Sequence, residues 1–230
     1  GINYRKNIYK LNAASTQGGL NTAGFYNLSN SVSNVDITDF TSSQEIFSTF
    51  VNASVGIKDF AYVDVSYRLD INSTLPVGNN LYNYSSFGAS LIFSELFPKN
   101  DILSFGKFRA SYAQAGNGTT PYQLYNTYVT NPSFGANGTS TVPNDLNNAD
   151  LRPERTNAFE TGLDLRFLKG RIGLDVTYYN QVTNDMIFGV SQSASTGFTT
   201  RQLNAGKVLN HGVEIMATIT PVKTKDLRWD

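Results

Sequence analysis

Apolar and polar residues alternate with a period of two along most of this chain. Between Ala61 and Ile71 every second residue is apolar or aromatic, and the positions between them include Asp64, Arg68 and Asp70. Because successive side chains of a strand point to opposite faces, such a segment has one apolar face and one polar face. The same alternation recurs at 86–93, 107–112 and 171–178. The pattern predicts an all-β chain.

The strands that this alternation predicts follow one another from residue 45 onward. They cover 45–56, 60–71, 83–95, 105–115, 158–167, 171–181, 212–220 and a start at 227, with a weaker pair at 185–190 and 198–204. Residues 1–43 are rich in Asn, Ser, Thr and Gly, which predicts loops with one strand near Asn3–Leu11. We therefore expect two parts, a loop-rich segment at 1–44 and consecutive strands at 45–230.

The connections between the predicted strands alternate in length. The short ones lie at 57–59, 168–170 and 221–226, and the long ones lie at 71–83, 116–157 and 182–211. Tilted strands of about 9–11 residues suffice to cross a bilayer. Short turns on one side and long loops on the other are typical of an outer-membrane barrel, with the turns in the periplasm and the loops outside the cell. The pattern thus predicts a segment of an antiparallel transmembrane β-barrel.

The composition agrees with a protein that meets lipid through strands. Charged residues make up 16% of the chain and aromatic residues 13%, and no run of about 18 apolar residues occurs. In a membrane strand only every second residue has to be apolar, so low charge without a long apolar run fits this class. The net charge is zero, which argues against nucleic acid as a partner. The absence of Cys excludes disulfides and cysteine-based metal sites.

Several blocks between residues 44 and 230 carry a family resemblance beyond their periodicity. The blocks read Tyr62-Val-Asp-Val-Ser-Tyr-Arg-Leu-Asp, Phe93-Ser-Glu-Leu-Phe, Gly106-Lys-Phe-Arg-Ala-Ser-Tyr-Ala-Gln-Ala-Gly-Asn, Ala149-Asp-Leu-Arg-Pro-Glu-Arg-Thr, Arg171-Ile-Gly-Leu-Asp-Val-Thr-Tyr-Tyr-Asn and Asn210-His-Gly-Val-Glu. In their order and spacing, they resemble the SusC/RagA-like branch of TonB-dependent outer-membrane transporters. One departure is His211, where that family more often carries Lys.

This resemblance implies a plugged barrel of roughly 22 strands. It also implies active import of glycans or peptides across the outer membrane of a Gram-negative bacterium, with TonB as the driving partner and a SusD-like surface lipoprotein as the cap. The chain would hold roughly a third of such a barrel, without the plug, the segment that contacts TonB or the final strand. No signal peptide precedes the strands and Asp230 falls where another strand begins, so we expect an internal piece of a longer polypeptide.

The charged residues of the predicted strands fall on the polar face. At mid-bilayer, an Arg or Lys that faced lipid would cost about 2–4 kcal/mol, so these side chains are expected to face the barrel interior. We predict that Arg68, Asp70, Arg109 and Arg166 line the lumen. There they would pair with one another, or contact the plug or the cargo.

Tyrosines recur in the longest predicted loop. Tyr122, Tyr125 and Tyr128 stand among Gly, Asn and Thr residues. Flat rings beside amide groups suit stacking on sugars or holding extended peptides. The same rings could instead fix the loop onto a neighbouring element or onto the capping lipoprotein. We carry these three tyrosines forward as candidate ligand-binding residues.

No catalytic, cofactor or metal site is expected. The lone His211 has neither a second His nor a Cys with which to form a zinc site or a catalytic relay. Asp145 and Asp150 flank an Asn-rich stretch that lacks the spacing of a calcium loop. The sequence therefore predicts a transporter segment rather than an enzyme.

Two other classes of protein remain open at the level of sequence. A passive porin or adhesin barrel would show the same strands and loops, and an upstream plug with a TonB-contacting segment would exclude it. A soluble, secreted all-β carbohydrate-binding module would pack its apolar faces between two sheets and stay in solution without detergent. A secreted β-enzyme is a weaker third possibility, because no acid–base or nucleophilic group of residues is visible.

Overall fold

The computed structural model describes residues 1–98, 101–134, 137–223, 225 and 228–229. Its long strands are β1 Ile2–Leu20, β2 Ser31–Ile57, β3 Ala61–Asn72, β4 Leu81–Leu91, β5 Leu103–Asn117, β9 Glu154–Phe167, β10 Ile172–Ser191 and β11 Thr200–Ile219. The short elements are β6 Val129–Phe134, β7 Asn137–Thr141, β8 Asp145–Leu146, β12 Val222–Lys223 and β13 Arg228–Trp229, with single 3-10 turns at η1 Leu28–Asn30, η2 Phe93–Leu96 and η3 Ala194–Thr196.

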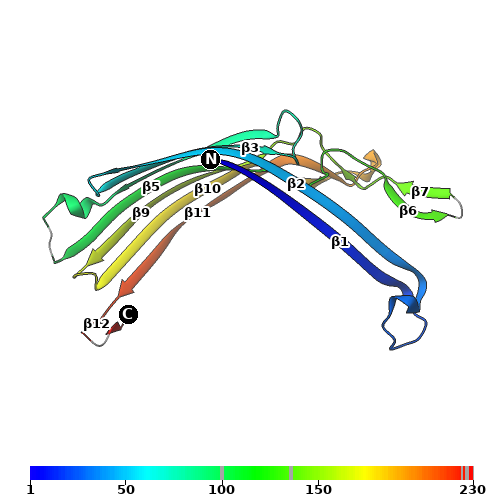
Figure 1. The fold of residues 1–230 in the computed structure, drawn as a ribbon, viewed down its shortest axis with the longest axis horizontal. Helices are drawn as coiled ribbons and strands as arrows, with labels where there is room; N and C mark the ends of the chain where they lie inside the picture. The colour runs from blue at the N-terminus through cyan, green and yellow to red at the C-terminus, as the bar shows by residue number, and fades with distance from the viewer. Residues whose placement is uncertain (99–100, 135–136, 224, 226–227, 230) are drawn as a thin grey trace.

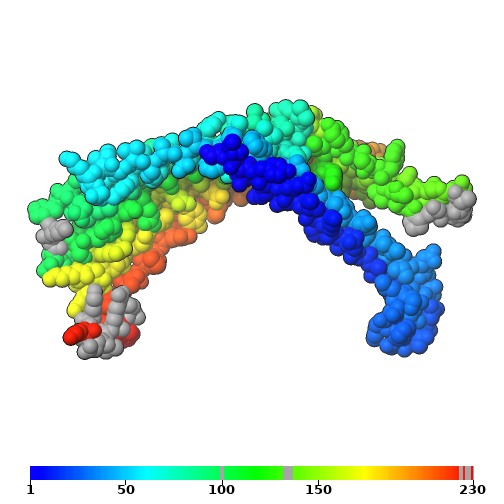
Figure 2. All heavy atoms as spheres, viewed as in Figure 1, coloured from blue at the N-terminus to red at the C-terminus, as the bar shows by residue number. Residues whose placement is uncertain are grey.

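The long strands form one curved antiparallel sheet in the order β1-β2-β3-β4-β5-β9-β10-β11, and β8 joins the edge of β11 (Figure 1). Each long strand thus pairs with the long strand that precedes it in the chain. The whole sheet bends into an arch (Figure 2). Among the described residues, no helix is long and apolar enough to cross a membrane. The structure confirms the predicted all-β, antiparallel fold class.

The connections at one end of the sheet are tight turns. Lys58 and Asp59 link β2 to β3 with φ angles of 44° and 59°, and Leu168 and Lys169 link β9 to β10 with φ angles of 54° and 60°. Two successive positive φ angles are typical of a type I′ turn, and Gly170 continues the second run with a φ angle of 80°. The β1–β2 and β10–β11 loops lie at the opposite end (Figure 1). The short turns and the long loops therefore gather at opposite ends of the sheet, as the sequence predicts.

The first 43 residues differ from the prediction of a loop-rich segment. β1 and β2 pair from Ile2↔Thr49 through Ser15↔Asp36, so most of this segment is a long hairpin. Both strands of this hairpin are largely exposed, and the two strands pair without burying an apolar face. The strands predicted near Asn3–Leu11 and at 45–56 are parts of β1 and β2, and the prediction missed the rest of the hairpin, where backbone hydrogen bonds form without a regular alternation. Loop structure is confined to the tip around 21–30.

The region 182–211 also differs, because β10 and β11 continue through it. The weak strand predicted at 185–190 lies in the last part of β10, and the one predicted at 198–204 overlaps the first part of β11. Asp185, with a φ angle of 55°, lies in an irregularity of the pairing between Thr183 and Met186. This bulge shifts the side-chain alternation, so the sequence pattern breaks although the strand continues.

Two strand ends also need correction. β4 ends at Leu91 rather than 95, and the residues that follow form η2. The strand expected to start at 227 begins at a residue outside the described part of the chain, and β13 covers Arg228–Trp229.

The apolar face of the sheet is exposed rather than covered. Val51 and Val213 keep 63% and 60% of their surface accessible. Apolar residues of neighbouring strands lie side by side on this face, since Val65 pairs with Phe87 and Phe87 pairs with Tyr112. A contiguous apolar face of this size matches a hydrocarbon environment, as expected for the outer surface of a membrane barrel.

Candidate functional site

Arg68 and Asp70 form a network on the polar face of β3. Arg68 Nε donates to Asp70 Oδ1 at 2.8 Å, and Arg68 Nη2 donates to Ser48 Oγ at 2.9 Å. The Tyr84 hydroxyl donates to Asp70 Oδ2 at 2.6 Å. Asp70 is only 4% exposed, so these donors compensate a carboxylate that has lost most of its water. The network links β2, β3 and β4.

Arg109 makes a longer connection, from β5 across β9 to β10. Its Nη1 and Nη2 donate to the two carboxylate oxygens of Asp175 at 2.9 and 2.8 Å, and Nη2 also donates to Thr177 Oγ1 at 2.6 Å. The guanidinium passes over Gly162, where a Cβ atom would lie 2.7 Å from Arg109 Nε. The glycine leaves the space that the two-pronged ion pair needs.

Arg166 is held more loosely. Its Nη2 lies 3.6 Å from Asp164 Oδ2, and its side chain is 58% exposed. The guanidinium also lies 5.0 Å from the centre of the Phe105 ring. The structure thus gives all four predicted lumen residues polar or aromatic partners, and their exposure to a lumen stays a prediction.

Tyr122 connects the long loop to β2. Its hydroxyl donates to the Thr41 carbonyl at 3.4 Å, and its ring meets the Phe40 ring edge-on at 6.4 Å between centroids. Tyr125 and Tyr128 are 68% and 75% exposed. Tyr122, itself 62% exposed, thus contacts β2, and a ligand-binding role for any of the three rings stays a prediction.

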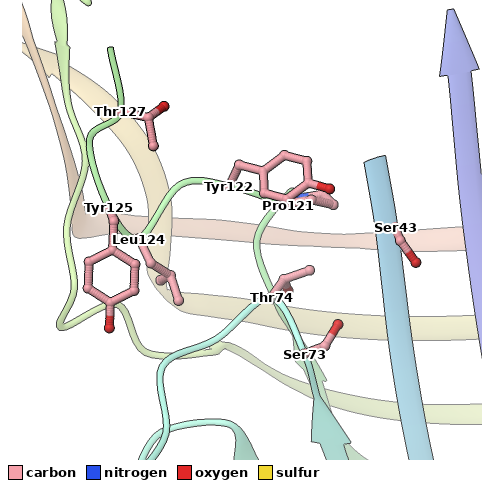
Figure 3. Close-up of a pocket in the computed structure, with 8 residues that line it drawn as sticks. All are labelled: Ser43, Ser73, Thr74, Pro121, Tyr122, Leu124, Tyr125 and Thr127. Carbon is pink, nitrogen blue, oxygen red and sulfur yellow. The ribbon is translucent and has the colours of Figure 1, made fainter. Parts of the chain in front are cut away.

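A cavity of about 320 Å³ opens beside Tyr122 and Tyr125 (Figure 3). Tyr122, Leu124 and Tyr125 contribute from the loop, and Ser43 contributes from β2. The remaining lining residues are Ser73, Thr74, Pro121 and Thr127. Its described lining thus combines aromatic rings with hydroxyl groups and carries no charged side chain. Tyr128 does not line this cavity.

Two asparagines hold the loop around this cavity in place. The Asn147 side chain donates to the carbonyls of Tyr122 and Tyr125 at 3.1 and 2.9 Å. Asn126 Oδ1 accepts from the Asn147 N–H at 2.9 Å, and Asn126 Nδ2 donates to the Asp145 carbonyl at 2.6 Å. Sequence reasoning missed this pair, because Asn residues are common throughout the chain and nothing local sets these two apart.

A small apolar core packs between the loops at this end of the sheet. Leu75, Tyr82 and Leu151 are buried together, and Leu151 has no exposed surface. Leu124 packs against them, and Asn79 Nδ2 donates to the Leu151 carbonyl at 3.3 Å. The β3–β4 connection and both halves of the long loop therefore meet in one cluster.

The described residues contain no group of three or more His, Cys, Asp or Glu side chains arranged to hold a metal ion. His211 lies in β11, where it pairs with Asn180. The chemistry that this arrangement supports is recognition by rings, hydroxyl groups and ion-paired side chains.

Comparison with known proteins places this chain in a family. The whole chain, residues 1–230, matches the family described as TonB dependent receptor-like, beta-barrel. TonB-dependent receptor P26 of Formosa agariphila is 30% identical over the full chain and 24% of its own length. TonB-dependent receptor SusC of Bacteroides thetaiotaomicron is 34% identical over 47% of this chain and 11% of its own.

A solved structure of the RagAB peptide importer in its closed-closed state superposes with a TM-score of 0.83 at 21% identity, over 99% of this chain and 26% of that one. The chain spans between 11% and 24% of the length of the curated relatives that it matches. Proteins of this family are β-barrels of the Gram-negative outer membrane. The chain belongs to the TonB-dependent receptor-like β-barrel family and is SusC-like within it.

Proposed function

We propose that the full-length protein containing this chain imports oligomeric nutrients, glycans or peptides, across the outer membrane in a TonB-dependent way. A SusD-like surface lipoprotein would cap its long-loop end. Membership of the receptor family over the whole chain supports this proposal. The similarity to SusC and to a protein named as a peptide importer supports oligomers as the cargo.

The observation that carries the proposal is the cavity bordered by Tyr125 at the long-loop end. Its volume of about 320 Å³ lies at the lower limit of the 300–1,000 Å³ typical of small-ligand sites. A cavity of this size holds a short unit of a longer ligand, whose other units would contact neighbouring loops. The exposed Tyr125 ring suits stacking on the flat face of a sugar or on a peptide side chain.

The roles of the residues follow from their contacts. Tyr125 would contact cargo directly, whereas Tyr122, Asn126 and Asn147 would keep the loop in a binding geometry before cargo arrives. Such preorganisation lowers the entropy lost on binding. The polar face of the strands would then receive the cargo, and TonB would supply the energy for its passage.

The test compares two tyrosine variants of the full-length protein. The protein is first shown to be a barrel by detergent-dependent extraction and heat-modifiable migration on a gel. Labelled neutral oligosaccharides and mixed oligopeptides are then supplied to cells with and without the proton-motive force. We expect energy-dependent uptake that Tyr125→Ala reduces about two- to tenfold, because stacking on an aromatic ring contributes about 0.5–1.5 kcal/mol.

Tyr128→Ala serves as the matched control, because Tyr128 is also an exposed loop tyrosine but does not line the cavity. Uptake that survives loss of the proton-motive force would instead indicate a passive porin. A protein that stays in solution without detergent would indicate a secreted binding module.

A further inference from the structure

A second cavity, of about 360 Å³, lies at the same end of the sheet. Leu81, Tyr82 and Asn83 border it from β4, and Gly78 and Asn79 border it from the β3–β4 connection. Its remaining lining residues are Arg152, Pro153, Arg155 and Asp185. The two cavities border the same small core, since Tyr82 belongs to this lining and Leu124 of the first cavity packs on that core.

The charge of this second cavity differs from that of the first. Arg155 is exposed and forms no ion pair with any described residue. Arg152 Nη2 lies 3.2 Å from Asp185 Oδ1, which leaves its other guanidinium N–H groups available. Two guanidinium groups and one carboxylate give the lining a net positive charge, and the Asn83 side-chain amide adds a neutral donor.

The backbone that carries both arginines is fixed. The Arg152 N–H donates to Asn204 Oδ1 at 2.9 Å, and Asn204 Nδ2 donates to the carbonyls of Arg152 and Asp185, both at 2.8 Å. Glu154, between the two arginines, accepts from the Ile187 N–H at 2.8 Å. The backbone at Arg152 is therefore fixed, and its guanidinium is also held by the ion pair with Asp185, which limits the entropy that this residue loses on binding a ligand.

Guanidinium groups recognise carboxylate, sulfate and phosphate groups through paired N–H donors. We propose that this second cavity binds the carboxylate or sulfate group of an acidic glycan while the first cavity holds a neutral part of the same chain. This inference rests on the proposed import function and narrows its cargo to acidic oligosaccharides.

The arrangement favours a glycan over a peptide. Peptides that bind to sheets commonly do so by strand addition, through main-chain hydrogen bonds to a free strand edge. The first cavity instead offers side-chain hydroxyl groups and aromatic rings, and the second offers amide and guanidinium groups. Hydroxyl-rich rings bearing anionic substituents complement such a surface.

The test measures binding by the full-length protein in detergent with three probes. These are an oligogalacturonate, a neutral malto-oligosaccharide of equal length and an acidic oligopeptide. We expect the oligogalacturonate to bind about tenfold more tightly than the neutral probe, because a charge-assisted hydrogen bond contributes about 1.5 kcal/mol or more. Raising the salt concentration should shrink this difference.

Arg155→Gln should abolish the preference for the acidic probe and leave binding of the neutral probe unchanged. Arg155→Lys, which keeps the charge but not the fork of donors, should retain part of it. Arg171→Gln, at the turn end of the sheet, is the matched control for loss of a positive charge and should change nothing. Heat-modifiable migration of each variant confirms that the barrel has formed.

Binding of the neutral probe without a preference for the acidic one would overturn this inference and leave the proposed import function standing. Tight binding of the acidic peptide alone would overturn the assignment to a glycan. Failure of all three probes to bind would count against both proposals.

Discussion

The contact between Arg109 and Asp175 across Gly162 predicts a coupling that can be measured. Gly162→Ala would place a methyl group where the Arg109 side chain lies, since the added Cβ would be 2.7 Å from Nε. The guanidinium would have to move, and the two-pronged contact with Asp175 would be lost. Arg109→Ala removes the same contact from the other side. We therefore expect the two substitutions to affect one interaction rather than two.

The expected magnitude follows from the exposure of the pair. A hydrogen bond to a charged group contributes about 1.5–3 kcal/mol, whereas an exposed ion pair contributes about 0.2–1 kcal/mol. The Arg109 and Asp175 side chains are 39% and 25% exposed, between these two situations. We expect Arg109→Ala to lower the free energy of unfolding by about 1–2 kcal/mol.

Replacing a strand glycine by Ala should by itself add about 0.5–1 kcal/mol, because Gly loses more conformational freedom on folding. In the wild-type protein, Gly162→Ala loses the ion pair and gains the backbone term, so the net destabilisation should be between about 0 and 1.5 kcal/mol. In the Arg109→Ala background the same substitution should stabilise by about 0.5–1 kcal/mol. The sign of the Gly162→Ala effect should reverse between the two backgrounds.

The assay is a double-mutant cycle on the full-length protein in lipid vesicles, with urea unfolding followed by tryptophan fluorescence. Gly88→Ala is the matched control, because its Cβ would meet only Asp64 Cβ at 3.8 Å, an ordinary contact. It should stabilise slightly in both backgrounds. Additive effects of Gly162→Ala and Arg109→Ala would show that the ion pair does not depend on the glycine and would refute the reasoning.

Three further predictions test other parts of the structure. Phe87→Arg on the apolar face should lower the free energy of unfolding by about 2–4 kcal/mol and reduce the amount of heat-modifiable barrel. Ser111→Arg on the polar face should be tolerated. Equal effects of the two substitutions would contradict the assignment of the faces. Leu151→Ala should speed proteolysis of the long loop while the unfolding midpoint of the strands stays unchanged, because the buried leucine belongs to the loop core. Replacing Lys58 and Asp59 by Asn and Gly should raise the unfolding midpoint, because those residues adopt positive φ angles at lower cost, and an unchanged midpoint would argue against a strained turn.

The sequence predicts best what repeats locally. The alternation from Ala61 to Ile71 predicts β3 almost to the residue, since the structure places it at Ala61–Asn72. It fails where a strand lacks a regular alternation, as along the second half of β1, and where a bulge interrupts the pattern at Asp185. In both places the strand is held by backbone pairing, which leaves no mark in the order of apolar and polar residues.

From the sequence, only the types of residue in the candidate site can be predicted, not their contacts or roles. The aromatic loop residues stand out in the sequence, but their different roles do not. Tyr122 contacts Phe40 and Thr41, which come from a segment that the sequence pattern assigns to loops, so its fixing role could not be inferred. Arg152 and Arg155 belong to a block that carries family resemblance, yet only the fold brings them beside Asn83 on β4.

The Arg109 contact shows where inference from sequence stops. The short connection between β9 and β10 leaves few registers available, and in the structure four residues separate the paired Phe167 and Ile172. A two-residue turn at Leu168 and Lys169 would place Gly162 opposite Asp175, whereas the observed connection places it opposite Thr177. The register between β5 and β9 has no such constraint, because the connection between them is long, and a shift by one residue would turn Arg109 to the opposite face. Neither the pairing of Gly162 with Thr177 nor the arginine that passes over the glycine could thus be assigned from the sequence alone. Long-range register, rather than residue pattern, decides which charged side chains of the polar face meet.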